Sequence, residues 1–189
     1  MAQAKTLSKT ELKRVLDYNA ACERHAERNR AMLLLTHWTG MRIGEVVSLR
    51  LGDVVDCNGE IRSEIQLTAE QTKGNRARVV FVPVRMRKEL KRYVQSAVAR
   101  HSADFLFRTQ KSKQFTSNTA TQLLQRIYER CGLQGATSHS GRRSFITELA
   151  SKGVSVRVLA ALSGHRSIAT TQRYIDVNDD MLRKAVELI

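Results

Sequence analysis

The sequence predicts a mainly α-helical domain with one small antiparallel β-sheet, which is an α+β fold. Two observations carry this prediction. Most segments repeat apolar residues with the period of a helix, and one stretch, residues 59–84, is rich in β-branched residues around a turn signal. The 42% share of hydrophobic residues is ordinary for a globular protein, and no repeat or long linker divides the chain. We therefore expect a single domain over residues 1–189.

The first third of the chain predicts three helices. Ser8 and Glu11 have the spacing of a capping box, ahead of apolar residues at helical period: Leu12, Val15, Leu16 and Ala20. Residues 27–40, ERNRAMLLLTHWTG, predict a second helix that is buried in its apolar latter half and ends at Gly40. Residues 43–50, IGEVVSLR, predict a short third helix after the turn.

The middle of the chain predicts the sheet. Residues 59–71 and 77–84 have β-rich composition, and residues 72–75 between them, TKGN, supply a glycine and an asparagine where a hairpin needs positive φ. The one proline, Pro83, should end the sheet. The two segments therefore predict an antiparallel hairpin with Lys73 at its tip.

The rest of the chain predicts further helices. Residues 85–100 form an amphipathic pattern, with a basic face opposite Met86, Leu90, Tyr93, Val94 and Ala97. Residues 115–133 predict a helix capped by Ser117 and stopped by Gly132, whose apolar stripe is Ala120, Leu123, Leu124, Ile127 and Cys131. Three short helical pieces divided by Gly153 and Gly164 follow, and residues 179–189 predict a last amphipathic helix.

Charge is the strongest compositional signal. The chain has 32 Lys and Arg against 18 Asp and Glu, which gives a formal net charge of +14 and a pI near 10.3. Because the basic residues are spread along the whole chain, we expect a folded surface that contacts a polyanion, and not a basic tail. No run is long and apolar enough for a membrane span, and the N-terminus lacks a secretory signal, which favours a cytoplasmic protein without membrane partners.

The cysteines predict neither disulfides nor a metal site. Cys22, Cys57 and Cys131 are odd in number and far apart, and they lack the paired spacing of a zinc site. We expect reduced thiols, with Cys131 packing on a helix face.

Several polar residues lie where predicted elements end. Arg42 follows the turn at Gly40, and Glu45 three residues later is placed to hold it by a salt bridge. His139 and Arg142 have i, i+3 spacing at the start of a helix, so both side chains can face one spot, where a helix N-terminus favours an anion. Residues 162–175, LSGHRSIATTQRYI, place Tyr174 in a polar, basic neighbourhood, which is unexpected for one of only four tyrosines.

Taken in order, Arg42, Lys73, His139, Arg142, His165 and Tyr174 resemble the tyrosine recombinase (phage integrase) family. The resemblance covers nearly the whole chain and rests on TGMRIGEVVSLRLGDV, TKGNRARVVFVP and the segment from Ser138 to Ile175. The last segment is the most specific, since it combines H-x-x-R, G-H and a tyrosine nine residues after that histidine. Ser140 and Gly141 depart from the acidic residue and leucine that are common at these positions in the family, while the catalytic residue types remain.

The resemblance implies a site-specific recombinase that cleaves and rejoins DNA through a covalent 3′-phosphotyrosine, in integration, excision or inversion. Arg42 and Arg142 would clamp the scissile phosphate, whose oxygens match guanidinium groups in shape and charge, with His139 and His165 as further donors. Tyr174 would be the nucleophile. His139 is the candidate base, and the resemblance gives Lys73 the task of protonating the leaving 5′ oxygen.

The resemblance also implies the partners. It predicts double-stranded DNA as substrate, self-association on DNA into a tetrameric synapse, and accessory DNA-bending proteins. Because the bond energy is kept in the phosphotyrosine, no cofactor, ATP or metal is expected. The setting would be a prokaryotic cytoplasm, with the protein associated with the nucleoid or encoded by a mobile element.

The ends of the chain leave alternatives open. Only about 25 residues precede the buried second helix, so the family's N-terminal DNA-clamping domain is not expected here. We expect a natural minimal recombinase similar to the fimbrial DNA invertases, with a catalytic fragment as the alternative. The C-terminal segment, residues 179–189, resembles an element that docks on a neighbouring subunit. Its apolar residues, Met181, Leu182, Ala185, Val186 and Ile189, would otherwise pack on their own domain.

Two other functions compete with recombination. Residues 145–175 also resemble a helix–turn–helix, which would suit a non-catalytic DNA-binding regulator. A type IB topoisomerase would use related chemistry without pairing two sites. The regulator predicts that the six residues do not meet at one phosphate-sized spot, so their positions in space test it.

Overall fold

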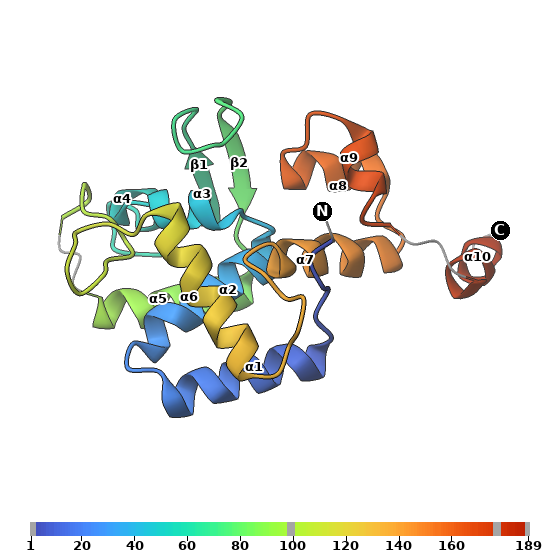
Figure 1. Ribbon diagram of the computed structural model, residues 1–189. Coiled ribbons are helices and arrows are strands. Elements are labelled where there is room, and N and C mark those ends of the chain that lie inside the picture. Colours follow the sequence, from blue (N-terminus) through green and yellow to red (C-terminus); the bar gives the residue numbers. More distant parts are fainter. Residues whose placement is uncertain (1–2, 98–100, 176–178, 188–189) are drawn as a thin grey trace.

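We describe a computed structural model of the chain, in which residues 3–97, 101–175 and 179–187 are described (Figure 1). The predicted fold class is confirmed, because helices dominate and one two-stranded antiparallel sheet interrupts them. In chain order the elements are α1 (Lys9–Cys22), α2 (Ala26–Thr39), α3 (Ile43–Ser48), α4 (Leu51–Val54), β1 (Glu64–Leu67), β2 (Arg78–Phe81), α5 (Val84–Ser96), α6 (Ser117–Arg130), α7 (Ser140–Ser151), α8 (Val156–Ser163), α9 (Ile168–Gln172) and α10 (Asp179–Val186).

The first two helices begin and end as predicted. The Ser8 hydroxyl accepts from the backbone N–H of Glu11 at 3.1 Å, and the Glu11 carboxylate accepts from the N–H of Ser8 at 2.9 Å, which completes the capping box. Helix α2 ends at Gly40, whose φ of +68° lies in the left-handed region. A side chain there would also meet the Phe145 ring, since an added Cβ would lie 2.5 Å from it.

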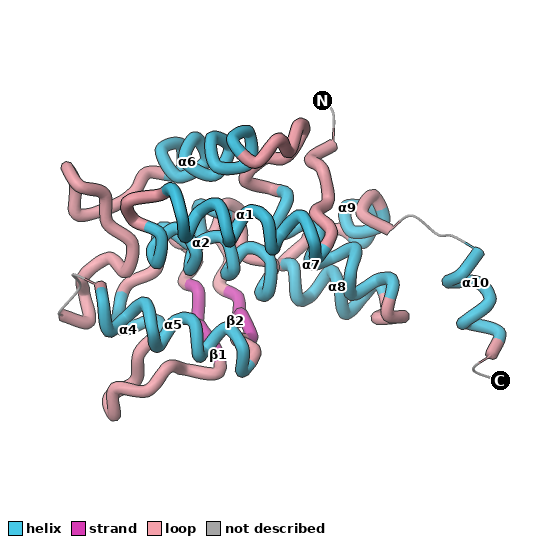
Figure 2. Tube along the Cα trace, turned by 90° about the horizontal axis from the view of Figure 1, so that it is seen from below, coloured by secondary structure: helices cyan, strands magenta, loops and turns pink. Residues whose placement is uncertain are grey.

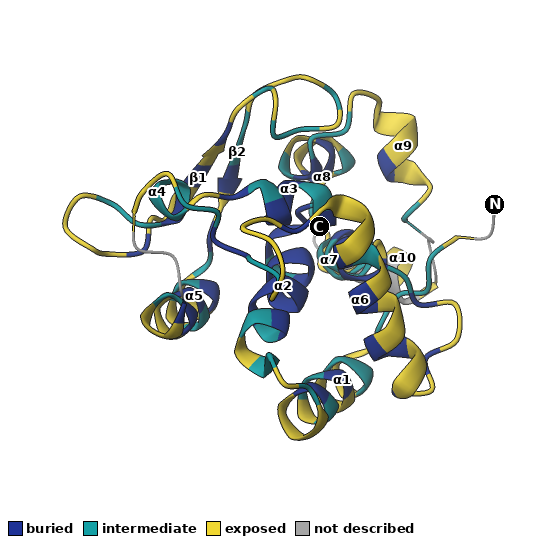
Figure 3. Ribbon diagram, turned by 60° about the vertical axis from the view of Figure 1, so that its left-hand side comes forward, coloured by how far each residue is buried: buried dark blue, intermediate teal, exposed yellow. Residues whose placement is uncertain are grey.

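Helix α2 forms the centre of the main core. Its residues from Ala31 to Leu35 are at most 2% exposed. Figure 3 shows α2 buried, with α1, α5, α6 and α7 around it and their exposed faces turned outward. The stripe of α6 and the apolar face of α5 join this core, including the buried thiol of Cys131. The Arg42 turn at the end of α2 is therefore held by the best-packed helix of the molecule.

The sheet is shorter than the sequence predicted. Strands β1 and β2 pair antiparallel over four residues each, with Ile65 opposite Val80, and Pro83 caps α5 two residues after β2 ends. In the connecting loop Asn75 takes the expected positive φ of +50°, while Gly74 does not. A two-residue type I′ turn would need positive φ at both of its central residues. The loop instead spans residues 68–77, and within it only Asn75 has positive φ.

The N-cap of one helix was predicted wrongly, and one short helix was missed. The N-cap of α6 is Thr116 and not Ser117, because the Thr116 hydroxyl accepts from the N–H of Thr119 at 3.1 Å. Thr116 and Ser117 both have a hydroxyl that suits an N-cap. Thr116 takes this position because its hydroxyl accepts from the N–H of the residue three positions later. The four-residue helix α4 was not predicted, since it is too short to show a period.

The last third of the chain builds a second, smaller cluster. Ile146 and Ala150 of α7 pack with Leu159 of α8, and Tyr174 and Ile175 lie against them. Helices α7, α8 and α9 have the boundaries that Gly153 and Gly164 predicted. Helix α10 lies apart from the other helices in Figures 1 and 2, with Leu182 and Val186 exposed, and Ile189 falls outside the described residues.

The two clusters meet where α2 packs against α7, its most extensive helix contact. The close approach depends on Gly141, since a Cβ at that position would lie 2.1 Å from Thr36 Oγ1 and 2.8 Å from His37 Nδ1. His37 is fully enclosed there, and burial lowers its pKa to about 4, so the ring is neutral. The departure from the family pattern at Gly141 thus has a steric cause. Within the described residues no helix is long and apolar enough to cross a membrane.

We predict that Gly141→Ala lowers the free energy of unfolding by about 1–3 kcal/mol, because the methyl group forces α2 and α7 apart. In an open helix the same change would stabilise the protein by about 0.5–1 kcal/mol, so the sign is diagnostic. Urea unfolding measures it, with exposed Ser151→Ala on α7 as the control that should change little. A stabilised Gly141→Ala variant would contradict the steric argument.

Candidate active site

The site begins at a buried carboxylate. Glu45 of α3 is 1% exposed, and its two oxygens bind two different guanidinium groups. Arg42 Nη1 lies 3.0 Å from Oε1, which confirms the expected ion pair, and Arg78 Nη2 lies 2.7 Å from Oε2. The backbone N–H of Arg42 also donates to Oε2 at 2.8 Å. Burial alone raises the pKa of Glu45, but these hydrogen bonds and the charges of Arg78 and Arg42 hold it below its usual value.

Arg78 was not among the residues singled out from the sequence. It opens β2, opposite Leu67, and its Nη1 donates to the carbonyl of Leu162 in α8 at 3.0 Å. The side chain thereby connects the hairpin, α3 and α8. A usable signal existed, because Arg78 alternates in phase with Val80 on the buried face of the strand, where an arginine is rare.

Arg142 lies in the first turn of α7 and is 3% exposed. Its Nη1 donates to the carbonyl of Gly40 at 2.7 Å, and its Nη2 donates to the carbonyl of Ser163. Burial, followed by the charge of Arg42, lowers the pKa of Arg142 to about 9, so the guanidinium stays charged at neutral pH. These contacts use two of its five N–H groups, which leaves three for a ligand.

His165 and Tyr174 lie face to face at the other side of the site. Their rings stack with centroids 5.6 Å apart and planes 17° from parallel. Nδ1 of His165 is 2.8 Å from Oγ1 of Thr171, which is fully buried, so Nε2 remains available for a ligand. The turn before His165 requires Gly164, whose φ is +62° and whose added Cβ would lie 2.7 Å from Arg78 Cδ.

Tyr174 is half-buried and not locked in the interior. Its backbone carbonyl accepts from Thr147 Oγ1 at 3.1 Å, and the Arg143 guanidinium lies 5.7 Å from the ring centroid. The ring packs on the rim of the smaller cluster. The backbone of the tyrosine is therefore anchored, while the ring lies between His165 and Arg143.

His139 and Lys73 complete the predicted set from two further elements. His139 is the exposed N-cap of α7 and caps no N–H with its ring. Partial removal of the ring from water is the largest cause that lowers the pKa of His139, and the positive charges of Arg142, Arg42 and Lys73 lower it as well. Lys73 is exposed in the loop between β1 and β2. Because the charges of all three cations act on His139, all three lie near its ring.

Some of the predicted site residues line one cavity of about 410 Å³. Arg42, Lys73 and His165 line it, together with Glu45, Arg78 and Arg166. Arg142, His139 and Tyr174 lie around it and not in its wall, but their contacts and electrostatic influence tie them to the residues that do. Burial, followed by the charges of Arg142, Arg42 and Arg78, lowers the pKa of His165 to about 4. The imidazole of His165 is therefore neutral at pH 7.

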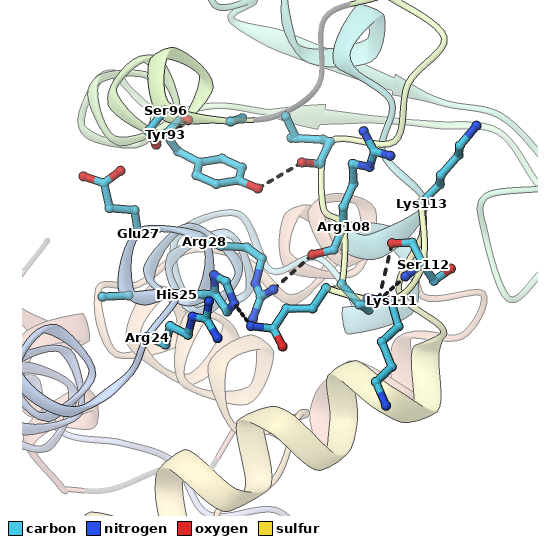
Figure 4. A pocket seen from close by; sticks show the side chains of 15 residues that line it. Arg24, His25, Glu27, Arg28, Tyr93, Ser96, Arg108, Lys111, Ser112 and Lys113 are labelled. Carbon is cyan, nitrogen blue, oxygen red and sulfur yellow. Dashed lines mark hydrogen bonds between the residues drawn. The ribbon is translucent and has the colours of Figure 1, made fainter.

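A larger cavity of about 660 Å³ lies at the other end of α2 (Figure 4). It is lined by basic residues, but their side chains point in different directions, and Lys111 and Lys113 extend away from each other. Its central cation, Arg28, is engaged by the carbonyl of Arg108 at 3.0 Å and by Asn29 Oδ1 at 3.0 Å. Because the basic side chains that Figure 4 labels diverge, this cavity offers no comparable cluster of cations around one point.

Comparison with known proteins identifies the family. The model of the phage integrase family matches residues 5–181. The chain belongs to the phage integrase family.

Relatives and solved structures agree with this membership. Tyrosine recombinase XerA of Pyrococcus furiosus is 28% identical over 186 residues, which cover 97% of this chain and 61% of that protein. Tyrosine recombinase XerC of Herpetosiphon aurantiacus is 33% identical, over 81% of this chain and 49% of that protein. The chain thus spans about three fifths or less of these curated relatives.

Two solved structures share the fold. A crystal structure of XerA recombinase matches with a TM-score of 0.77 and 26% identity, over 100% of this chain and 66% of that one. The XerH site-specific recombinase bound to its palindromic difH substrate, a post-cleavage complex, matches with a TM-score of 0.72 and 24% identity, over 96% of this chain and 51% of that one. The second likeness shows the fold alone.

We predict that Arg78→Met lowers the free energy of unfolding by about 3 kcal/mol, because it leaves the enclosed Glu45 carboxylate with one partner fewer. Chemical denaturation measures the loss, and the double variant with Glu45→Gln should recover part of it. The matched control is Lys91→Met, which breaks a 2.9 Å pair with Glu60 at the exposed surface and should cost less than about 1 kcal/mol. Equal losses in both single variants would contradict the buried bridge.

Proposed function

We propose that this chain cleaves and rejoins double-stranded DNA at a specific site through a covalent 3′-phosphotyrosine at Tyr174. The observation that carries the proposal is the stacking of Tyr174 on His165. Burial lowers the pKa of His165 most, and the charges of Arg142 and Arg42 also lower it, which shows that both lie near the ring. A tyrosine, an imidazole and two guanidinium groups from separate parts of the sequence are neighbours. A DNA-binding regulator would not need that neighbourhood.

Charge supports a phosphodiester as the substrate. Glu45 binds the guanidinium groups of Arg42 and Arg78, and its charge also acts on nearby Arg142, so three positive charges and one negative charge leave an excess of two. In-line attack on a phosphodiester adds negative charge to its non-bridging oxygens. Fixed donors that are already oriented stabilise that added charge, and losing one costs on the order of 3 kcal/mol of transition-state stabilisation.

In the proposed cleavage step, one residue takes up a proton and another supplies one. His139, whose pKa is lowered by burial and then by the charges of its cationic neighbours, takes the proton of the Tyr174 hydroxyl while that oxygen forms a bond to phosphorus. The bond from phosphorus to O5′ breaks, and the ammonium of Lys73 supplies the proton to the leaving oxygen. Rejoining runs the same steps in reverse with a 5′ hydroxyl as nucleophile. Arg42, Arg142 and Nε2 of His165 hold the phosphate throughout.

The assembly on DNA is part of the same proposal. Integration, excision and inversion all require the exchange of two DNA sites, for which we propose a tetrameric synapse with accessory DNA-bending proteins. The amphipathic α10, with Leu182 and Val186 exposed, is proposed to dock on a neighbouring copy. We propose residues 1–189 as the catalytic domain of a cytoplasmic recombinase that is nucleoid-associated or encoded by a mobile element.

We predict that a nicked suicide substrate traps a protein–DNA adduct and that Tyr174→Phe abolishes it, because phenylalanine lacks the attacking oxygen. The substrate comes from genomic DNA fragments, and sequencing the trapped fragments gives the target site. Denaturing gel electrophoresis and peptide mapping measure the adduct. Tyr18→Phe is the control, since that hydroxyl contacts Arg130 on α6 and should not matter. An adduct that persists in Tyr174→Phe would remove Tyr174 from this role.

A further inference from the structure

The loop that carries Lys73, residues 68–77, is fixed mainly at its base. Gln71 Nε2 donates to the carbonyl of Ser48 at 3.2 Å and to Asp53 Oδ2 at 2.8 Å, which fastens the start of the loop to α3 and α4. The hydroxyl of Thr72 donates to the carbonyl of Arg76 at 2.8 Å, within the loop itself. These contacts shape the loop but do not set its distance from the histidine and the nucleophile.

One contact ties the tip of the loop to the opposite side of the cavity. The guanidinium of Arg166 donates through Nη2 to the carbonyl of Gly74, the residue after Lys73. Among the described residues this is the one hydrogen bond that joins residues 73–75 to another element. A Cβ added to Gly74 would lie 3.5 to 3.8 Å from Nη2, Nε and Cζ of Arg166, so the guanidinium also packs on the backbone there.

The position of Arg166 gives this contact a consequence. Arg166 directly follows His165, and both line the 410 Å³ cavity with Lys73 and Gly74. In Figure 1 the hairpin and the α8–α9 pair project from the same side of the molecule and face each other. Arg166 therefore connects the element that carries the acid to the element that carries the histidine.

We propose that Arg166 is a positioning residue that sets Lys73 against the leaving oxygen by holding the carbonyl of Gly74. The proposal rests on the function proposed above. In the cleavage step the bond between phosphorus and O5′ breaks, and the Lys73 ammonium transfers a proton to O5′. That transfer demands close placement, because a misplacement of about 1 Å costs on the order of a hundredfold in rate.

A different role would be direct contact with DNA. Arg166 is exposed, and an exposed arginine beside a phosphate site commonly binds a neighbouring phosphate. The two roles predict different kinetics. Loss of a phosphate contact weakens DNA binding and leaves the cleavage rate at saturating DNA unchanged. Loss of Lys73 placement slows cleavage at saturation and changes affinity little.

The chemistry of the leaving group separates the roles further. A substrate with sulfur in place of the bridging 5′ oxygen releases a thiolate, which needs no proton at neutral pH. A variant that fails only in placing the acid should recover on the sulfur substrate. A variant that misplaces the nucleophile or the phosphate should not.

The experiment measures single-turnover cleavage by the full chain at saturating DNA, on paired oxygen and sulfur suicide substrates. We compare wild type, Arg166→Ala, Lys73→Ala and the control Arg157→Ala, which removes an exposed arginine of α8 outside the cavity. We expect Arg166→Ala to cleave the oxygen substrate about 10 to 100 times more slowly than wild type and the sulfur substrate within about threefold of it. Lys73→Ala should show the same recovery, and Arg157→Ala should match wild type on both.

Three other outcomes are possible, and each would contradict a specific part of the proposal. If Arg166→Ala binds DNA more weakly but cleaves at the wild-type rate when saturated, the residue contacts DNA and does not position Lys73. If its defect persists on the sulfur substrate, or if Lys73→Ala is not rescued, the link between Arg166 and the acid is wrong. If wild type forms no adduct on either substrate, the proposed function itself fails.

Discussion

The arrangement of the site depends on the enclosed carboxylate of Glu45. One oxygen holds Arg42 and the other holds Arg78, so a single side chain fixes the turn after α2 and the start of β2. Arg78 then reaches the carbonyl of Leu162 at the end of α8, which places the Gly164 turn and His165. An ion pair inside a protein adds little net stability, but removing one partner is costly, so the bridge fixes geometry more than it stabilises the fold.

The same bridge sets the electrostatics of the cavity. Glu45 neutralises one of the guanidinium charges around it. Burial lowers the pKa of His139 and His165 most, and the remaining positive charge of the cations lowers both pKa values further. A neutral imidazole has one nitrogen that can accept a proton and one N–H that can donate a hydrogen bond, and it adds no repulsion to the cations before it is protonated. A phosphodiester placed here would meet charge that is already oriented, with little reorganisation of solvent or side chains.

Local signals made much of the fold and the site predictable. The capping box at Ser8, the stop at Gly40 and the apolar stripe of α6 each depend on residues a few positions apart, and all three occur as predicted. The alternation of β2 could have placed Arg78 on the buried face, but its partners lie 33 and 84 positions away, and no local pattern encodes such contacts. The contact between Arg166 and Gly74 spans 92 positions and was missed for the same reason. The motif located Arg142, yet only the packing of α7 on α2 explains why glycine precedes it.

The long-range contacts also explain how the proposed nucleophile and the proposed phosphate clamp come to lie together. Arg42 lies between Met41 and Ile43 of the main core, whereas Tyr174 packs on the smaller cluster and stacks on His165. Two arginines span the boundary, Arg142 from Gly40 to Ser163 and Arg78 from Glu45 to Leu162. These guanidinium groups crosslink the two clusters, and in the proposed function they also supply the charge for the phosphate. Because the same groups serve both purposes, the distance between Tyr174 and the clamp is set by the docking that brings the charges together.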